Sequence, residues 1–415
     1  MKLVKILCSI MIIAAAAFMP LAFTSGAANA EEGNASAETD MENLKFKDGK
    51  FKIMIFSDTH NTDKPIKDTI TLMSSALDKY NPDLLVFLGD NTGGWWRGVT
   101  EEKTRKAVDE LLKPVAAKGT PFAFVFGNHA EDGDVMKDKI FDFYKAYPNC
   151  LAVKNTLGDR VGNYNLTIKS SDGEKDAFNL WFIDSGSEAD EGGYAYVTDA
   201  QKAWYEQKSD ELKAANGGEV LKSLLFQHIA VPEVYDLFDV VEKGTKGAFR
   251  GHGSHKDNYY IASDKVVFGE AREGPCPPDV NNGQFASWKS RGDVVGAFFG
   301  HDHINNYSGL QDGVRLTSCI STGFYSYGNL HGVTLVELDE RDLSTFGLET
   351  KFYEEIVGEK PSNALIARWG YIDFNRKILP AIIVCPIAAA GVALAAVLIV
   401  KRKKRKKNKK AENND

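Results

Sequence analysis

Short apolar runs, each ending in a polar loop, form the clearest pattern in the first third of the chain. Residues 51–56 (FKIMIF), 84–88 (LLVFL) and 121–126 (PFAFVF) are continuous enough to predict buried strands. Apolar residues at helical spacing predict helices over 66–80 and 101–117, between these strands. Such alternation is typical of an α/β sheet, in which functional loops lie at the carboxyl ends of the strands.

The rest of the chain is richer in predicted strands. A helix fits residues 199–215, whereas residues 242–293 have the composition of a long loop region with several glycines. Two sheets packed together and flanked by helices would accommodate this number of strands. The strands are predicted at 163–168, 178–183, 221–227, 294–299, 314–319, 332–338 and 346–354.

The N-terminal 30 residues have the layout of a secretory signal peptide. Lys2 and Lys5 precede an apolar stretch, and small residues close on Ala28-Asn29-Ala30, so we expect cleavage after Ala30. A retained N-terminal anchor is the alternative, which this small-residue ending disfavours. The polar residues 31–45 are too poor in apolar groups to form a core and predict a flexible leader.

A second apolar segment lies near the C-terminus. The 23 residues from Ile378 to Val400 carry no charge, and at about 1.5 Å per residue they are long enough to cross a membrane. Nine of the next ten residues are basic, which predicts a cytoplasmic tail over 401–415. Residues 46–354 would then form one extracellular domain, followed by a juxtamembrane or packing segment over 355–377. The sequence therefore predicts a single-pass cell-membrane protein.

The charge of the chain is distributed unevenly. Residues 1–30 and 401–415 hold eleven basic and two acidic residues, and without them the net charge falls from −7 to −16. An acidic ectodomain repels polyanions, which argues against nucleic-acid binding, and no protein partner is evident. The ectodomain cysteines are Cys150, Cys276 and Cys319. Three cysteines make no disulfide framework, although one bridge stays open.

Five short polar motifs each follow an apolar strand. Singly, an Asp or His beside a glycine is usually a turn or cap residue. The motifs are Asp58-x-His60, Gly89-Asp90, Gly127-Asn128-His129, His228 and Gly300-His301-Asp302-His303. In this order, over residues 50–340, they resemble the calcineurin-like metallophosphoesterase superfamily, which includes the purple acid phosphatases. The resemblance implies an α/β (α+β) fold, a four-layer αββα sandwich of two mixed sheets flanked by helices.

The same resemblance implies two divalent or trivalent metal ions. One would be bound by Asp58, His60 and His303, the other by Asn128, His228 and His301, and Asp90 would bridge them. Carboxylate, amide and imidazole ligands suit Mn, Zn or Fe. Two such ions clamp the oxygens of an anionic phosphoester and lower the pKa of bound water.

His129 is implied to be a catalytic group and not a ligand. In the family it faces the substrate and assists the leaving group, while a hydroxide bridging the ions attacks phosphorus in line. Relatives often carry an acidic residue next, where this chain has Ala130, so whether Glu131 orients His129 stays open. Asp302 is expected to support a histidine or to face solvent.

The chain departs from purple acid phosphatases at Gly93. Those enzymes carry a tyrosine ligand three residues after the bridging aspartate, so we expect no tyrosinate ligand and no purple colour. Other segments are similar to purple-acid-phosphatase-related phosphatases that lack this tyrosine. They are residues 181–186 (WFIDSG), 228–233 (HIAVPE), 282–283 (NG) and 300–307 (GHDHINNY).

Residues outside these motifs allow two interpretations. Trp95 and Trp96 could stack on a substrate ring or pack under their loop, and Arg97 could meet a phosphate oxygen or lie exposed. His252 and His255 have the spacing of a ligand pair, but a surface loop explains them better.

These observations predict a membrane-anchored phosphohydrolase that acts on phosphomonoesters of small molecules. A phosphodiesterase or nucleotidase is one alternative, and an enzyme that acts on lipid or wall phosphates near its anchor is another. A non-catalytic surface protein that retains the fold is a third, and the intact ligand set argues against it.

Overall fold

The computed structural model describes residues 44–93, 99–190, 192–382 and 397–403. The predicted signal peptide, most of the leader and the loop with Trp95, Trp96 and Arg97 lie outside these ranges. So do residues 383–396, the larger part of the predicted membrane span. Among the described residues, no helix is both long and apolar enough to cross a membrane.

The first sheet has five strands and contains the three N-terminal strands predicted from apolar runs. Its order is β17-β16-β1-β2-β3. The strands β1, β2 and β3 are parallel, whereas β16 and β17 are antiparallel to their neighbours, so the sheet is mixed. The strands are β1 (Lys50–Phe56), β2 (Leu84–Leu88), β3 (Phe122–Val125), β16 (Gly332–Asp339) and β17 (Asp342–Phe352).

The second sheet has seven strands in the order β12-β14-β15-β13-β8-β7-β6. Its centre is parallel, from β7 through β8 and β13 to β15, and its outer strands are antiparallel. It is therefore also mixed, as predicted. The strands are β6 (Tyr164–Lys169), β7 (Asp176–Ile183), β8 (Ser223–Gln227), β12 (Val266–Phe268), β13 (Val294–Phe299), β14 (Ser308–Gln311) and β15 (Val314–Ser318).

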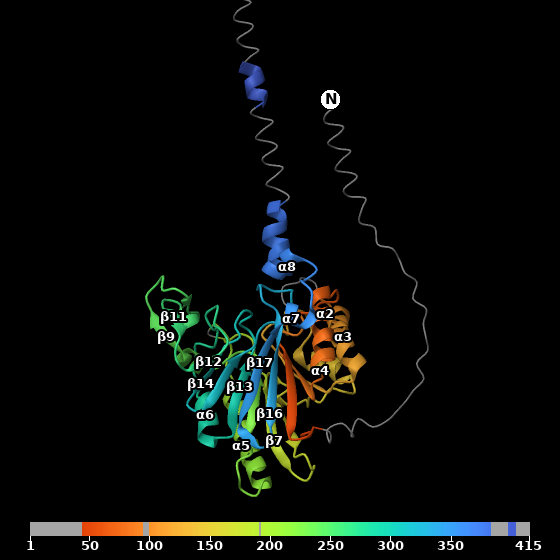
Figure 1. Ribbon diagram of the computed structural model, residues 1–415, viewed down its shortest axis with the longest axis vertical. Helices are drawn as coiled ribbons and strands as arrows, with labels where there is room; N and C mark the ends of the chain where they lie inside the picture. The colour runs from red at the N-terminus through yellow and green to blue at the C-terminus, as the bar shows by residue number, and fades with distance from the viewer. Residues whose placement is uncertain (1–43, 94–98, 191, 383–396, 404–415) are drawn as a thin grey trace, which may run out of the picture. The chain divides into compact units, whose positions relative to one another are not determined.

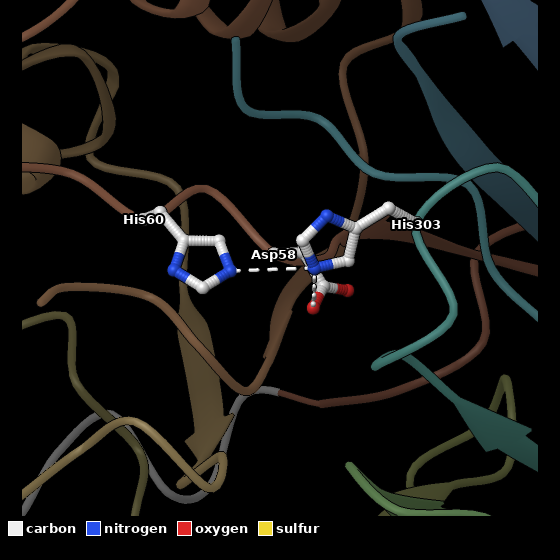
Figure 2. A group of neighbouring side chains, drawn as sticks. All are labelled: Asp58, His60 and His303. Carbon is white, nitrogen blue, oxygen red and sulfur yellow. Dashed lines mark hydrogen bonds and ion pairs between the residues drawn. The ribbon is translucent and has the colours of Figure 1, made fainter. Parts of the chain in front are cut away.

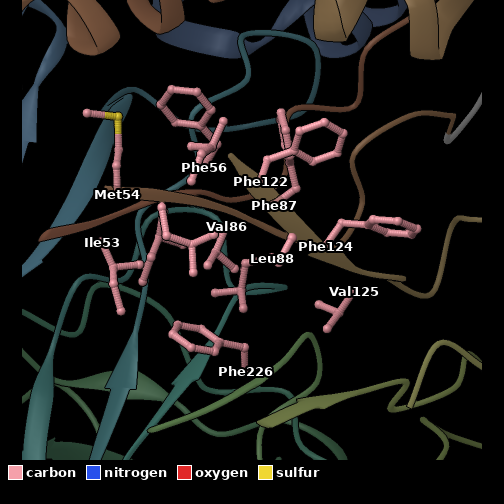
Figure 3. Close-up of a cluster of buried hydrophobic side chains, with 14 of the residues drawn as sticks. Ile53, Met54, Phe56, Val86, Phe87, Leu88, Phe122, Phe124, Val125 and Phe226 are labelled. Carbon is pink, nitrogen blue, oxygen red and sulfur yellow. The ribbon is translucent and has the colours of Figure 1, made fainter. Parts of the chain in front are cut away.

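The two sheets face each other across an apolar core. Side chains alternate along β2, so Val86 and Leu88 point toward Phe226 of the second sheet while Phe87 points the opposite way (Figure 3). A ladder of stacked rings crosses the inner face of the second sheet, with ring centroids 4.7 to 5.3 Å apart. The ladder consists of Tyr164, Phe182, Phe226 and Phe298.

Helices cover the outer faces of both sheets. The helices α2 and α3 pack on the first sheet through apolar faces, with Leu72, Met73, Leu111 and Val115 fully buried. A separate cluster, which includes Trp181, Tyr205 and Trp288, lies between the second sheet and α5 and α6. Figure 1 shows the two sets of helices on opposite sides of the sheets. The helices are α2 (Lys67–Tyr80), α3 (Glu101–Lys118), α4 (Lys137–Lys145), α5 (Asp199–Ala215) and α6 (Gln284–Arg291).

The region predicted as a long loop, residues 242–293, contains more structure than expected. It holds part of a small three-stranded sheet of β9 (Phe238–Val241), β10 (Phe249–Arg250) and β11 (Tyr259–Ala262), as well as β12 and α6. These strands are only two to four residues long and only partly buried. Such short strands show no reliable hydrophobic period, which explains why the sequence did not reveal them.

Short elements complete the chain. The segment after β17 is helical and packs on the domain, because Tyr353 and Ile356 belong to its core. It comprises α7 (Tyr353–Val357), α8 (Ala364–Trp369), α9 (Tyr371–Asp373) and the π-helical turn η4 (Phe374–Ile378). The remaining elements are the hairpin β4 (Thr156–Leu157) and β5 (Arg160–Val161) and the 3₁₀ turns η2 (Pro232–Leu237) and η3 (Gly253–His255).

Candidate metal centre

The carboxyl ends of strands from both sheets bring all seven predicted ligands to one place. Hydrogen bonds join the loops that carry them: the Asp58 amide donates to the Gly89 carbonyl at 3.2 Å, and the Gly300 amide donates to the His228 carbonyl at 3.1 Å. Asp58 and His60 follow β1, Asp90 follows β2, Asn128 follows β3, His228 follows β8, and His301 and His303 follow β13.

Two clusters of possible metal ligands form at this edge. In the first, one ligand atom each of Asp58, His60 and His303 lies within 4.8 Å of the others. The His303 Nε2 atom is 3.4 Å from Asp58 Oδ1 and 3.4 Å from His60 Nε2, and the two imidazoles point toward each other (Figure 2). This trio matches the set that the family resemblance implied.

The second cluster contains Asp90, His228 and His301, again within 4.8 Å of one another. The His228 Nε2 atom is 3.2 Å from Asp90 Oδ2 and 3.1 Å from Asn128 Oδ1, so the amide joins this group. Asp90 also approaches the first cluster, with Oδ2 3.6 Å from His60 Nε2. Its position between the two clusters fits the predicted bridging role.

The residues fit a pair of cations better than a network of hydrogen bonds. His301 Nε2 and His60 Nδ1 are buried and have no hydrogen-bond partner within the described structure. The Nδ1 atom of His228 donates to the Leu88 carbonyl at 2.9 Å, which leaves Nε2 with its lone pair directed into the site. Convergent lone pairs from imidazole, carboxylate and amide groups are the donors that Mn, Zn or Fe prefers.

The carboxylates at the centre stay ionised, so the site favours the binding of cations. Burial raises the pKa of Asp58, but the charges of His228 and His303 outweigh it and lower the pKa to about 2. Burial lowers the pKa of His301 to about 3, so this imidazole is neutral and able to ligate. Burial also lowers the pKa of His228, but the charges of Asp90 and Asp58 reverse this and raise it to about 9. The two carboxylates thus attract any cation, whether a proton or a metal ion.

The backbone at the ligands is unusual. Of the described residues other than glycine, seven have a positive φ, and four of them are the predicted ligands Asp58, His60, Asp90 and His301, at 43 to 72°. Left-handed conformations cost free energy for residues with a Cβ atom and cluster at functional sites. Here they are held by neighbouring strand ends, as where the His60 amide donates to the Asp90 carbonyl at 2.8 Å.

The glycines of the motifs make room for ligands from other motifs. A Cβ atom at Gly89 would lie 2.4 Å from His228 Nδ1, and one at Gly127 would lie 2.1 Å from Asp90 Oδ1. At Gly300 it would lie 2.3 Å from Ser57 Oγ and 2.8 Å from Asp58 Oδ2. Each Gly-ligand pair in the sequence therefore reflects close packing between two strand ends.

His129 lies beside the two clusters without joining either. Its side chain is 21% exposed, and its ring centroid is 5.5 Å from that of His60. The Nδ1 atom pairs with Asp132 Oδ2 at 2.7 Å. Burial lowers the pKa of His129, but Asp132 and Asp90 outweigh it and the pKa is raised, which favours the protonated ring.

The residue that pairs with the His129 ring is Asp132 and not Glu131. Glu131 accepts a hydrogen bond from the Lys137 amide at 2.8 Å, and Asp132 orients His129 instead. Sequence reasoning missed Asp132. The available signal was an acidic residue three positions after His129, which a tight turn brings back to the ring.

The solvent-exposed alternative predicted for Asp302 is wrong, and among the described contacts its carboxylate binds a backbone amide and no histidine. The residue is 3% exposed, and its Oδ1 accepts a hydrogen bond from the Cys276 amide at 3.1 Å. Burial and the charge of Glu273 raise its pKa well above the usual range. Asp302 therefore links the loop around Cys276 to the loop that carries His301 and His303.

The cysteines Cys150, Cys276 and Cys319 are all free in the structure, so they form no disulfide with one another.

Gly93 stands where a tyrosine ligand would be needed for a purple enzyme. Its φ is +87°, and a Cβ atom would lie 3.0 Å from the His129 carbonyl oxygen. The local backbone is therefore adapted to glycine.

His252 and His255 belong to neither cluster. His255 stacks on Tyr235, with ring centroids 3.7 Å apart. The Tyr194 ring lies next to both His252 and His301, with ring centroids 5.9 Å and 4.3 Å away. The His331 ring stacks on Phe324, with ring centroids 3.8 Å apart.

Fold and site together define a dimetal-type phosphoesterase domain. The chain belongs to the calcineurin-like phosphoesterase family, whose sequence model matches residues 51–305. That match spans all five ligand motifs up to His303.

Particular relatives come from plants and yeast. A probable inactive purple acid phosphatase 14 of Arabidopsis thaliana is 25% identical over 79% of this chain and 79% of its own length. Phosphatase DCR2 of Saccharomyces cerevisiae is 27% identical over 66% of this chain and 48% of its own length. Among solved structures, a dimetal phosphatase from Danio rerio aligns over 73% of this chain and 96% of its own, with 12% identity and a TM-score of 0.47.

Proposed function

We propose that this protein is a metal-dependent phosphohydrolase that cleaves phosphomonoesters at the outer face of a membrane. The observation that carries the proposal is the pair of ligand clusters sharing Asp90, with His129 beside them. Two ions bound there would neutralise the charge of the phosphoester and activate water for attack.

The residues of the chain would divide the remaining work. The carboxylates and imidazoles hold fixed positions because adjacent strand ends and glycines confine them. His129, kept in orientation by Asp132, would give its Nε2 proton to the leaving oxygen as the bond from phosphorus to that oxygen breaks. The His129 ring, whose centroid is 5.5 Å from that of His60, supports this role because it lies beside the clusters.

The location is part of the proposal. The signal-peptide layout of residues 1–30, the uncharged run from Ile378 to Val400 and the basic residues after it support an extracellular domain on a single-pass anchor.

Hydrolysis assays test the activity. After chelation and addition of Mn or Zn, we expect nitrophenyl phosphate to be cleaved faster than its bis-ester. Faster cleavage of the bis-ester would favour the phosphodiesterase alternative. If neither ester nor any nucleotide is cleaved with several metals, the hydrolase proposal fails.

A non-catalytic role is the second candidate, because the Arabidopsis relatives carry the words probable inactive in their names. The complete ligand set of this chain argues against extending that description to it. Failure of all the hydrolysis assays, with metal bound, would favour this candidate.

A further inference from the structure

The loop between β15 and β16 contacts both segments that carry the histidines of the first cluster. It joins β15 to β16, and its Ser321 side chain donates to the Asp58 carbonyl at 3.1 Å, while its Ser321 amide donates to the His303 carbonyl at 3.0 Å. Gly323 packs so closely on the same strand end that a Cβ atom would lie 2.3 Å from the Thr59 carbonyl oxygen. This loop is therefore part of the wall of the candidate centre.

Tyr327 lies at the outer end of the same loop and covers a ligand. Its ring stacks on His303 with centroids 4.4 Å apart and an interplanar angle of 13°. Its hydroxyl donates to Glu273 Oε2 at 2.9 Å. Tyr327 is nevertheless 41% exposed, so it forms a rim between the centre and the surface.

The C-terminal helical segment is hydrogen-bonded to the loop that joins β15 to β16. The amides of Tyr371 and Ile372 donate to the carbonyls of Phe324 and Tyr325 at 3.0 and 3.1 Å. Gly370 lies against the Ser326 carbonyl with no room for a Cβ atom. The segment is thus a fixed part of the domain beside the centre and not a free stalk.

The outward side of this segment is apolar and aromatic. Leu365, Trp369 and Tyr371 are 41%, 40% and 38% exposed, whereas the neighbouring Ile366 and Ala367 pack on the core. With Tyr327 they make up a surface that we call the rim patch, defined as Tyr327, Leu365, Trp369 and Tyr371.

The composition and place of the rim patch fit a lipid surface. Trp and Tyr beside basic residues are typical of the membrane interface, and the Arg368 guanidinium lies 5.4 Å from the centre of the Trp369 ring. The exposed residues Arg376 and Lys377 follow, directly before the uncharged run that starts at Ile378. Because the chain continues from the rim patch into that run, a bilayer is the surface that the patch meets first.

We infer that the rim patch rests in the headgroup layer of the outer leaflet, and that the candidate centre acts on phosphomonoesters carried by lipids. The inference rests on the proposed function for its substrate and on the rim contacts for its geometry. A soluble enzyme on a long flexible stalk would have no such preference, because its centre would not be held at the membrane.

Fluorescence quenching tests the surface contact without any hydrolysis. The full-length chain is placed in phosphatidylcholine vesicles, with and without lipids brominated close to the headgroup. We expect bromolipid to quench wild type more than Trp369→Phe, because the two proteins differ only at the exposed Trp369 and share every other tryptophan. Equal quenching of the two would mean that protein or water covers Trp369, and would overturn the surface contact.

Activity tests the substrate class in the same vesicles, with phosphatidic acid as the lipid phosphomonoester and nitrophenyl phosphate as the soluble one. For a double Leu365→Ser, Trp369→Ser variant we expect the lipid-to-soluble rate ratio to fall about tenfold, with the soluble rate unchanged. The matched control is Val240→Ser with Val267→Ser, two residues 62% and 63% exposed on β9 and β12, away from α8 (Figure 1).

Three results separate this inference from the proposed function. An unchanged ratio in the double variant, or an equal fall in the control, overturns the lipid substrate even if Trp369 is quenched. Cleavage of nitrophenyl phosphate without cleavage of phosphatidic acid overturns it too, and leaves the proposed function standing. If neither ester is cleaved, the proposed function and the substrate class both fail, and quenching alone decides the surface contact.

Discussion

At the residue scale, the centre depends on side chains and glycines that hold each other in place. The seven candidate ligands could be singled out because each stands directly after an apolar strand in a recognisable motif. Their left-handed backbone and the contact of Gly89 with His228 could not be predicted, because both depend on segments that are distant in sequence and meet only in the folded chain. Asp132 was missed because only the turn brings it to His129.

Substitution of Gly89 tests this mutual packing. Gly89→Ala should reduce metal content and activity because the new Cβ atom meets the His228 ring. Gly244→Ala is the matched control, with φ +94° against +92° and no atom within 4 Å of the added Cβ. Both should lose about 1–2 kcal/mol of stability from backbone strain, so equal metal content in the two variants would contradict the packing argument.

The orientation of His129 gives a second test at this scale. Asp132→Asn should lower kcat with KM and metal content unchanged, by less than the about 10²- to 10⁴-fold expected for His129→Gln. Glu131→Gln should leave kcat unchanged, because Glu131 contacts only the Lys137 amide among the described contacts. A larger loss in Glu131→Gln than in Asp132→Asn, from steady-state kinetics, would reverse the assignment.

At the element scale, long apolar strands and amphipathic helices agreed with prediction to within a few residues. The elements that were not predicted include α4, α6, β12, β14 and the short strands β9 to β11. The buried residues of α4 do follow helical spacing, but the helix spans only nine residues, and β9 to β11 are two to four residues long and pair with one another. The start of α4 is held by a buried ion pair, in which Lys137 Nζ lies 2.9 and 3.0 Å from the two Asp184 oxygens after β7.

This ion pair should matter for stability. Lys137→Met leaves the Asp184 carboxylate buried without its cation, and should cost about 3–5 kcal/mol in the free energy of unfolding measured with urea. A double Lys137→Met, Asp184→Leu variant should recover part of that loss. Lys139→Met, on the exposed side of the same helix, should change stability little. A similar loss in both lysine variants would show that the buried pair has no special role.

At the scale of the whole molecule, both sheets contribute ligands to one edge, which ties the site to the complete sandwich. The predicted four-layer arrangement agrees with the two mixed sheets, their shared core and the helices on both outer faces. For the segment after β17 the sequence left two alternatives, a juxtamembrane or a packing segment. The structure shows packing, through Tyr353 and Ile356 in the core and through backbone hydrogen bonds to Phe324 and Tyr325.

The predicted processing is testable on the whole protein. A chain secreted through a signal peptide should lose residues 1–30, so the mature protein should begin at Glu31. N-terminal sequencing or intact mass of the membrane-purified protein measures this. A mature chain that retains Met1 and the following apolar stretch would instead support the N-terminal anchor.

Metal content tests the central claim most directly. After incubation with excess Mn or Zn and removal of free metal, elemental analysis of the full-length protein should give about two ions per chain. Asp90→Asn should hold at most one, because Asp90 lies between both clusters, whereas Asp132→Asn, outside both, should keep the full amount. A wild-type chain with no more than one ion, or an Asp90→Asn variant with an undiminished amount, would contradict the account.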